Sequence, residues 1–167
     1  RIIAPMKTLI VIGYVWPEPA SSAAGTRMMQ LLTLYRDAGY RVVFASPADF
    51  SPHAINLDDF GIESVTIKLN CSSFDQWVAK QAPDVVMFDR FMMEEQFGWR
   101  VEEQCPNAVR ILDMEDVHCL RDARHKAVKA ERELQPSDWQ SDIAYREIAA
   151  ILRCDLSLVI SEYEMRW

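Results

Sequence analysis

Residues 8–46 constrain the fold of this chain more than any other stretch. Residues 9–12 are an apolar run that is too short for a helix and ends at Gly13, which suits a strand buried on both faces. From Met28 the apolar residues recur with the spacing of one helix face, and Gly39 then favours the left-handed turn that ends a helix. Residues 41–45 begin a second apolar strand. The stretch therefore predicts a βαβ unit, whose right-handed crossover makes the two strands parallel.

Strand and helix patterns alternate along the rest of the chain. Residues 64–69 alternate apolar and polar side chains, which predicts an edge strand with one wet face. Buried strands are expected at residues 83–89, 108–112 and 155–162, and residues 47–62 read as a loop with one short helical turn. These patterns predict an α/β, Rossmann-like, doubly wound and mainly parallel sheet of about six strands.

Four helix predictions depend on particular residues. Ser73 and Gln76 have the spacing of a capping box, and Ser137 and Gln140 repeat that spacing later in the chain. Residues 92–104 are expected to place Met93, Phe97 and Val101 on one buried stripe, and residues 126–133 form a charged helix. The residues expected to face inward from the last helix are Trp139, Ile143, Ala144, Ile148, Ile151 and Leu152, and Trp77 and Trp99 are expected to pack in the same way.

Length and composition exclude several classes of protein. At 167 residues the chain makes one domain, and its net charge of −7 disfavours a general nucleic-acid binder. Four widely spaced cysteines without a CxxC pair indicate reduced, mostly buried thiols of a cytosolic protein rather than a zinc site. No apolar run approaches the roughly 20 residues that a bilayer-spanning helix needs. Because the last strand is followed by only a few residues, we expect a further domain to be missing from this sequence.

The candidate functional residues follow the carboxyl ends of the predicted strands, which converge on one crevice in a parallel sheet. They are the loop at residues 13–25, Asp89 with Arg90, and residues 113–124 and 161–162. Gly25 opens a helix whose free N–H groups and dipole favour an anion such as phosphate, and the alternative is that it only permits a turn. The chain has neither a GxGxxG nor a GxxxxGK[ST] motif, which disfavours a classical dinucleotide site and a P-loop.

Carboxylates lie close to an imidazole after the strand at residues 108–112. Asp113, Glu115 and Asp116 precede His118, and a carboxylate beside an imidazole orients it and raises its basicity, as a general base requires. The alternative is that Asp113 and Asp116 cap the next helix while His118 is an ordinary partly buried residue. One histidine among carboxylates gives only weak support for a metal site.

The chain has one basic stretch. Arg121, Arg124 and His125 share a helical face, and Lys126, Lys129 and Arg132 follow. Charge runs of this kind are usually solvated, and the alternatives are contact with an anionic acceptor or with a membrane surface.

Four segments, in this order, resemble the amino-terminal domain of GT-B glycosyltransferases of family 4. The first is a strand and a loop with Pro17 and Pro19, followed by GTR at residues 25–27 and by AGYRV at residues 38–42, where the helix ends. The others are PDVVMFDR at residues 83–90, ILDMEDVHCLRDAR at residues 111–124 and CDLSLVISEYE at residues 154–164. The resemblance covers nearly the whole chain.

This resemblance implies two Rossmann-like domains that face each other across a cleft. The amino-terminal domain, here residues 1–167, binds mainly the acceptor, and the carboxyl-terminal domain holds a nucleotide-sugar donor. The sugar is transferred with retention of configuration, without a bound metal and with no cofactor beyond the nucleotide-sugar co-substrate. The resemblance implies three groups of site residues: His118 and Asp116 as catalytic residues, Gly25 and Thr26 near the donor phosphates, and Asp89, Arg90 and Arg121 on the acceptor side.

The resulting expectation is the acceptor-side half of a retaining glycosyltransferase of the hexosyltransferase class. The full enzyme would move a sugar to a hydroxyl of a glycan or lipid-linked acceptor, as in the synthesis of cell-envelope glycans. It would work in the cytoplasm or peripherally at the inner face of the membrane, and this fragment alone would be inactive. The alternatives are a non-catalytic ligand-binding or regulatory module and a nucleotide-sugar epimerase of the same architecture. A receiver domain fits poorly, because Gly13 and Tyr14 stand where it needs an acidic pair.

Overall fold

The computed structural model describes residues 4–116, 118–139 and 141–160. Its six strands form a single parallel sheet in the order β3-β2-β1-β4-β5-β6. The strands are β1 (Thr8–Ile12), β2 (Arg41–Ser46), β3 (Glu63–Thr66), β4 (Val85–Asp89), β5 (Val109–Asp113) and β6 (Leu156–Leu158). The strand order reverses between β1 and β4, and the carboxyl ends of these two strands form the switch point where such sheets bind ligands.

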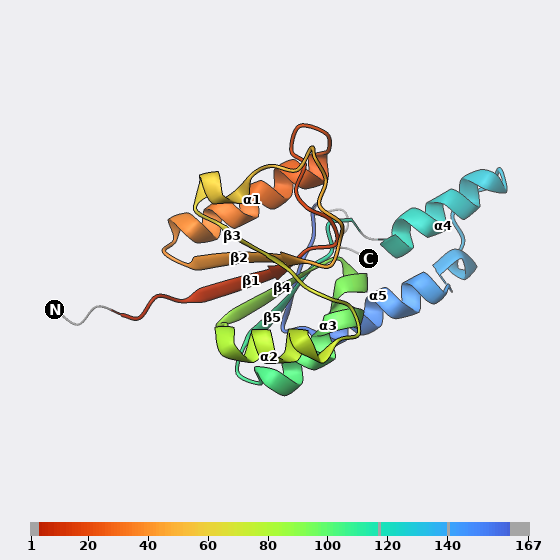
Figure 1. Ribbon diagram of the computed structural model, residues 1–167. Helices are drawn as coiled ribbons and strands as arrows, with labels where there is room; N and C mark the ends of the chain where they lie inside the picture. The colour runs from red at the N-terminus through yellow and green to blue at the C-terminus, as the bar shows by residue number, and fades with distance from the viewer. Residues whose placement is uncertain (1–3, 117, 140, 161–167) are drawn as a thin grey trace.

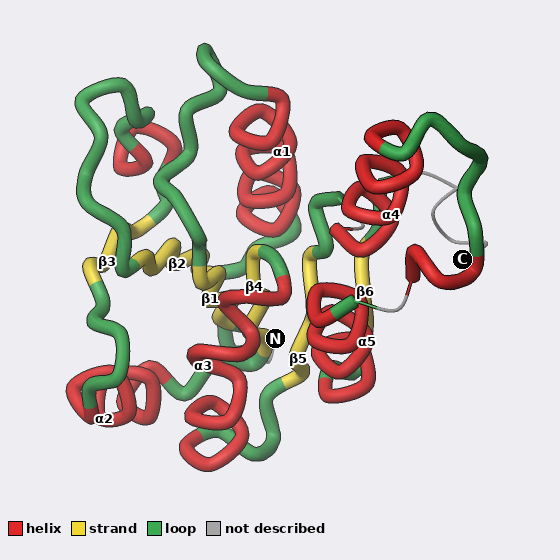
Figure 2. Tube along the Cα trace, turned by 90° about the vertical axis from the view of Figure 1, so that its right-hand side faces the viewer, coloured by secondary structure: helices red, strands yellow, loops and turns green. Residues whose placement is uncertain are grey.

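Helices cover both faces of the sheet (Figures 1 and 2). On one side lie α1 (Ala23–Asp37) and the short 3₁₀ helix η1 (Leu57–Phe60), and on the other lie α2 (Ser72–Gln81), α3 (Phe91–Gln104) and α5 (Asp142–Arg153). The helix α4 (His118–Lys129) projects beyond the carboxyl ends of the strands and packs against α5 and the 3₁₀ helix η2 (Pro136–Trp139) (Figure 1). No helix of the described residues is both long enough and apolar enough to cross a bilayer.

Two hydrophobic clusters, one on each face, hold the helices to the sheet. Leu9 and Val11 of β1 pack with Leu32 of α1 on one face, whereas Ile10 and Ile12 belong to the cluster beneath α2 and α3. Successive side chains of a strand point to opposite faces, so the apolar run of β1 is buried on both. This confirms the sequence prediction of a central strand.

The predicted βαβ unit and the class of fold are confirmed. Gly39 has a φ of 93°, the left-handed conformation expected after α1, and β3 is an edge strand, although it ends before the predicted boundary. The one helical turn expected in residues 47–62 is η1. The stripe of α3 is also as predicted, since Met93, Phe97 and Val101 are all buried.

Both predicted helix starts are wrong. The N-cap of α2 is Cys71, and the Ser73 hydroxyl donates to its sulfur at 3.0 Å instead of capping the helix. The N-cap of α5 is Ser141, whose hydroxyl accepts from the N–H of Ala144, while Ser137 belongs to η2, which ends before α5 begins. Gln140 lies outside the described residues. The helix expected at residues 126–133 is in fact the second half of α4, which starts at His118 and ends at Lys129.

The burial predicted around α5 is partly wrong. Ile148 and Leu152 are exposed, the latter by 80%, because α5 meets its neighbours through a face formed by Ala144, Glu147 and Ala150. The small alanines on this face allow the helix to approach closely. The strand expected at residues 155–162 is shorter and more exposed than predicted, and residues 161 and 162 lie outside the described part.

Two predictions about single residue types also need correction. Trp99 is exposed rather than packed, whereas Trp77 packs against the cluster beneath α2 and α3, and nothing is described of the Trp139 side chain. Cys71, Cys105 and Cys154 are free thiols, as expected, but their burial is intermediate.

A matched pair of leucines on α1 tests the core. Leu32 is fully buried and Leu34 is 64% exposed, so Leu32→Ala should lower the free energy of unfolding by about 2–5 kcal/mol. Leu34→Ala should change it by less than about 0.5 kcal/mol. Urea denaturation of both variants measures the two values. Equal losses would show that α1 does not pack on the sheet in this orientation.

Candidate functional site

A crevice of about 180 Å³ opens at the carboxyl edge of the sheet. It lies between the loop after β1, the first turn of α1, and the ends of β4 and β5. The side chains and backbone that line it mix carboxylates, guanidinium groups and apolar surface, and the polar or charged ones are Glu18, Ser22, Arg27, Asp89, Arg90, Asp113 and Glu115. Of the residues predicted for the site, Gly25, Asp89 and Arg90 are among those that line it.

Two buried carboxylates stand side by side at the floor of the crevice. Asp89 and Asp113 are register partners at the ends of β4 and β5, and the structure buries both. The Asp89 carboxylate accepts a hydrogen bond from the N–H of Tyr14 at 3.0 Å and lies 3.3 Å from Nε of Arg90. Burial raises the pKa of Asp89. The positive charge of Arg90 and the hydrogen bond from the Tyr14 N–H oppose this rise, and the negative charge of the nearby Asp113 adds to it.

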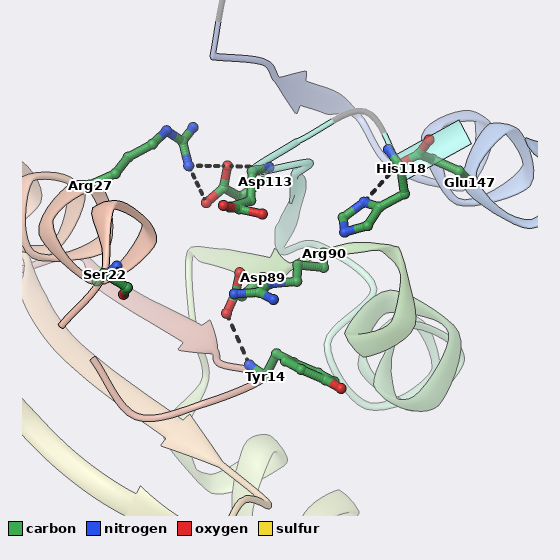
Figure 3. A network of polar contacts seen from close by, with 10 residues as sticks. Tyr14, Ser22, Arg27, Asp89, Arg90, Asp113, His118 and Glu147 are labelled. Atoms are coloured by element: carbon green, nitrogen blue, oxygen red, sulfur yellow. Dashed lines mark hydrogen bonds and ion pairs between the residues drawn. The ribbon is translucent and has the colours of Figure 1, made fainter. Parts of the chain in front are cut away.

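Asp113 is held by an arginine from the opposite side of the crevice. Nη1 of Arg27, on α1, donates to both carboxylate oxygens of Asp113, at 2.6 and 2.7 Å (Figure 3). The N–H of Glu115 donates to the same carboxylate at 3.2 Å. A fully buried carboxylate needs such a partner, because an unpaired charge is costly away from water. The pair therefore ties α1 to the end of β5.

Arg90 adopts a backbone conformation that is rare for a residue with a side chain. Its φ is 75° and its ψ is 157°, at the N-cap of α3, and its N–H donates to the carbonyl of Asp113 at 2.7 Å. Its guanidinium lies 4.9 Å from the centre of the Tyr14 ring. Such strained positions concentrate at functional sites, where the surrounding structure enforces them. Here the enforced turn places a guanidinium group at the crevice.

The start of α1 explains why residue 25 is a glycine. Ser22 is the N-cap, and its hydroxyl accepts the N–H of Gly25 at 3.0 Å. A Cβ on Gly25 would come within 2.7 Å of the Glu18 carbonyl, so the close approach of the loop requires glycine. The Thr26 hydroxyl donates to the carbonyl of Pro19 at 3.1 Å and does not line the crevice. These contacts favour a structural role for Gly25 and Thr26, and the predicted phosphate contact stays a prediction.

His118 lies beside the crevice rather than in its lining. Its Nδ1 is 3.1 Å from Oε2 of Glu147, and its backbone N–H donates to the same oxygen at 3.0 Å (Figure 3). The first N–H of α4 is therefore satisfied by Glu147, a residue of α5, rather than by Asp113 or Asp116. The Phe91 ring and the imidazole meet edge to face, with 5.4 Å between ring centres.

The remaining predicted site residues lie on the same side as His118. Asp116 pairs with Arg121, whose side chain is otherwise exposed, and neither residue lines the crevice. His125 and Lys129 on α4 are exposed as well, which agrees with the interpretation of this basic stretch as a solvated helix face.

Two residues at or near the site, Arg27 and Glu147, were not predicted to belong to it, whereas Tyr14 lies in the loop at residues 13–25 that the sequence had already indicated. Arg27 follows Gly25 on the first turns of α1, so its position relative to the crevice was available from the sequence. Tyr14 lies two residues after the end of β1, and a position after a parallel strand is the same signal that identified Asp89 and Arg90. The sequence did not indicate that Glu147 lies near the site, because a charged residue in the middle of an amphipathic helix is expected to face solvent.

The raised pKa of Asp89 predicts how the effect of a substitution depends on pH. A carboxyl group with a higher pKa in the folded state stabilises the fold below its ordinary pKa, near 3.8, and this contribution is lost as pH rises through the raised value. Asp89→Asn removes the titration, so the stability of this variant relative to the original protein should increase with pH across that window. Urea denaturation between pH 4 and pH 8 measures the difference.

Asp37→Asn, which removes an exposed carboxyl from α1, is the control and should change much less over the same range. A stability of Asp89→Asn relative to the original protein that falls as pH rises would contradict a raised pKa of Asp89.

Comparisons with family models and with curated proteins find no match. Among solved structures, sucrose-phosphate synthase from Thermosynechococcus elongatus matches with a TM-score of 0.58 and 16% sequence identity. The match covers 96% of this chain and 44% of that one, so the chain spans less than half of that structure. At this identity the likeness shows the fold alone, which is a Rossmann-like domain of the kind that forms one half of a GT-B architecture.

Proposed function

We propose that this chain is the acceptor-side, amino-terminal domain of a retaining glycosyltransferase, of family 4 by its motifs. The observation that carries the proposal is the crevice at the switch point, where charged side chains from β4, β5 and α1 converge. The fold likeness to sucrose-phosphate synthase, a glycosyltransferase, supports a transferase of this architecture. The donor is a nucleotide-sugar, and the acceptor is a hydroxyl of a glycan or a lipid-linked glycan.

The chemistry of the crevice supports a hydroxyl-rich acceptor. Asp89, whose pKa is raised by burial, can donate a hydrogen bond to a sugar oxygen when protonated and accept one from a hydroxyl when ionised. Arg90 offers a guanidinium at the same place, and the exposed part of the Tyr14 ring provides an apolar surface for the face of a sugar. The acceptor would lie against these groups, with Arg121 further along the same edge.

The start of α1 supports the placement of the donor. The amino end of α1 adds positive potential on the side of the crevice opposite Arg90, where the diphosphate would lie near Gly25 and Thr26. The proposed reaction needs no cofactor and no metal. His118 and Asp116 would contact the transferred sugar or the acceptor hydroxyl from the α4 side.

The same proposal places the protein in the cytoplasm, with peripheral contact to the inner face of the membrane. The exposed basic residues of α4 include Arg121 and Lys129, and they would suit peripheral contact with an anionic membrane surface on the cytoplasmic side. A lipid-linked acceptor would reach the crevice from that surface.

A donor screen on the full-length protein tests the function. UDP-, GDP- and ADP-sugars are offered without acceptor, and free nucleotide and thermal stability are measured. Release of nucleotide from one donor would support the transferase and identify half of the substrate pair. No release and no thermal shift with any nucleotide would favour the non-catalytic module, and conversion of the sugar without transfer would favour the epimerase.

His118→Ala in the full-length enzyme tests the predicted catalytic histidine. Loss of a group that exchanges hydrogen bonds with the reacting sugar should lower kcat by roughly 10²- to 10⁴-fold. The control is His53→Ala, which removes an exposed histidine from the loop before η1 and should leave kcat within about twofold. Turnover of His118→Ala equal to that of the original enzyme would remove His118 from the site.

A further inference from the structure

We propose that Glu147 is a positioning residue that fixes the orientation and the tautomer of His118. The role of the pair in sugar transfer rests on the function proposed above, whereas the tautomer follows from geometry alone. The two residues lie on helices that are separate in sequence, because His118 begins α4 and Glu147 lies in the middle of α5.

The hydrogen bonds determine which ring nitrogen of His118 carries the proton. A single oxygen, Oε2 of Glu147, is 3.0 Å from the backbone nitrogen of His118 and 3.1 Å from its Nδ1. The backbone N–H can only donate, and an ionised carboxylate can only accept, so Nδ1 must donate as well. In the neutral imidazole the proton therefore resides on Nδ1, and Nε2 keeps its lone pair.

Packing prevents the ring from turning. Phe91 is buried and meets the imidazole edge to face, with an angle of 75° between the ring planes. The Glu147 side chain that holds the other side is only 1% exposed. Figure 3 shows the second ring nitrogen of His118 directed away from Glu147, to the side where Arg90 lies. The available lone pair thus faces the site.

The position of Glu147 is unexpected for a residue whose only role is to stabilise the fold. It lies between Ala144 and Ala150 on the buried face of α5, where an apolar side chain would avoid the cost of burying a carboxylate. Two of the groups that offset this cost belong to His118, and the amino end of α4 also favours a negative charge. A buried carboxylate that binds both the backbone and the ring of one histidine determines the orientation of the ring and the nitrogen that carries its proton.

The tautomer of His118 determines which hydrogen bond its Nε2 can make with a substrate. With Nδ1 protonated and bound to Glu147, Nε2 can accept a hydrogen bond from a hydroxyl of the sugar or of the acceptor. The opposite tautomer would present a donor at Nε2 and could not accept from a hydroxyl. Glu147 therefore selects the hydrogen-bonding role of His118 without touching the substrate itself.

Nitrogen NMR of the full chain, with the histidine rings labelled with ¹⁵N, tests the inference directly. The sequence has three histidines, and substitution of the other two, His53→Gln and His125→Gln, assigns the signals. In the neutral ring of His118, Nδ1 should show the shift of a protonated nitrogen and Nε2 that of an unprotonated one. The exposed His53 and His125 serve as internal references. A His118 ring protonated at Nε2 would overturn the inference.

Three carboxylate variants separate positioning from general packing. Glu147→Gln keeps an accepting oxygen and should keep the Nδ1–H tautomer, whereas Glu147→Ala should give His118 the averaged shifts of an exposed histidine. The control is Glu94→Ala, which removes an equally buried carboxylate that pairs with Arg153 instead. It should leave the His118 signals unchanged. An equal change in Glu94→Ala, or none in Glu147→Ala, would contradict the proposal.

Kinetics of the full-length enzyme complete the test. Glu147→Ala should lower kcat by about 10- to 100-fold with KM within about twofold, and Glu147→Gln should recover most of the loss. An unchanged kcat in Glu147→Ala would overturn the role of Glu147 in the reaction.

If the donor screen fails while the tautomer is as expected, the proposed function is wrong and the positioning of His118 by Glu147 stands. If sugar is transferred but His118 has the other tautomer, the function stands and this inference falls.

Discussion

The crevice depends on how two adjacent buried carboxylates are kept from destabilising the sheet. Parallel strands in register bring Asp89 and Asp113 together at the ends of β4 and β5, where neither is solvated. Asp113 is neutralised by Arg27, and removal of that partner alone would leave a buried charge at a cost of roughly 3–5 kcal/mol. Asp89 instead combines a raised pKa with the Tyr14 N–H and Arg90. The pairing with Arg27 fixes α1 over the sheet, and the strained turn at Arg90 begins α3, so both helices that border the crevice depend on these carboxylates.

The sequence was sufficient to predict the fold because its strongest signals are local. The apolar run of β1, the helix face from Met28 and the turn at Gly39 each depend on a few neighbouring residues, and together they require parallel strands. The position of Asp89 and Arg90 followed from topology alone, since residues after parallel strands converge at one edge. The helix starts were less predictable. Cys71 and Ser141 stand at the N-caps of α2 and α5, and serines two residues later or four residues earlier offered equally plausible patterns.

The environment of α5 could not be predicted from periodicity. The helix has an exposed stripe with Ile148 and Leu152 in addition to its buried face, and the hydrophobic pattern assigned this stripe to the core together with Ile143, Ala144 and Ile151, which do pack there. The buried face is chosen instead by the neighbours, because α3 supplies Glu94 for Arg153 and α4 supplies His118 for Glu147. Both contacts join residues more than 25 positions apart, and a carboxylate at the centre of the buried face conceals that face from a hydrophobic pattern.

These two buried glutamates join α5 to its neighbours through different partners. Glu94 joins α3 to the end of α5 through an arginine, a contact between charged groups on two elements that pack on the sheet. Glu147 binds a histidine at the first residue of a helix that projects beyond the sheet, so its hydrogen bonds determine where α4 starts and how the imidazole faces. The crevice itself is built from residues of the sheet and of α1, which local sequence specifies well. The histidine beside it is held through a contact between helices, and that contact depends on the position of α5, which packs against α3. The residues that line the crevice therefore depend on the sheet and on α1, whereas the residue that contacts the histidine depends on the packing of one helix on another.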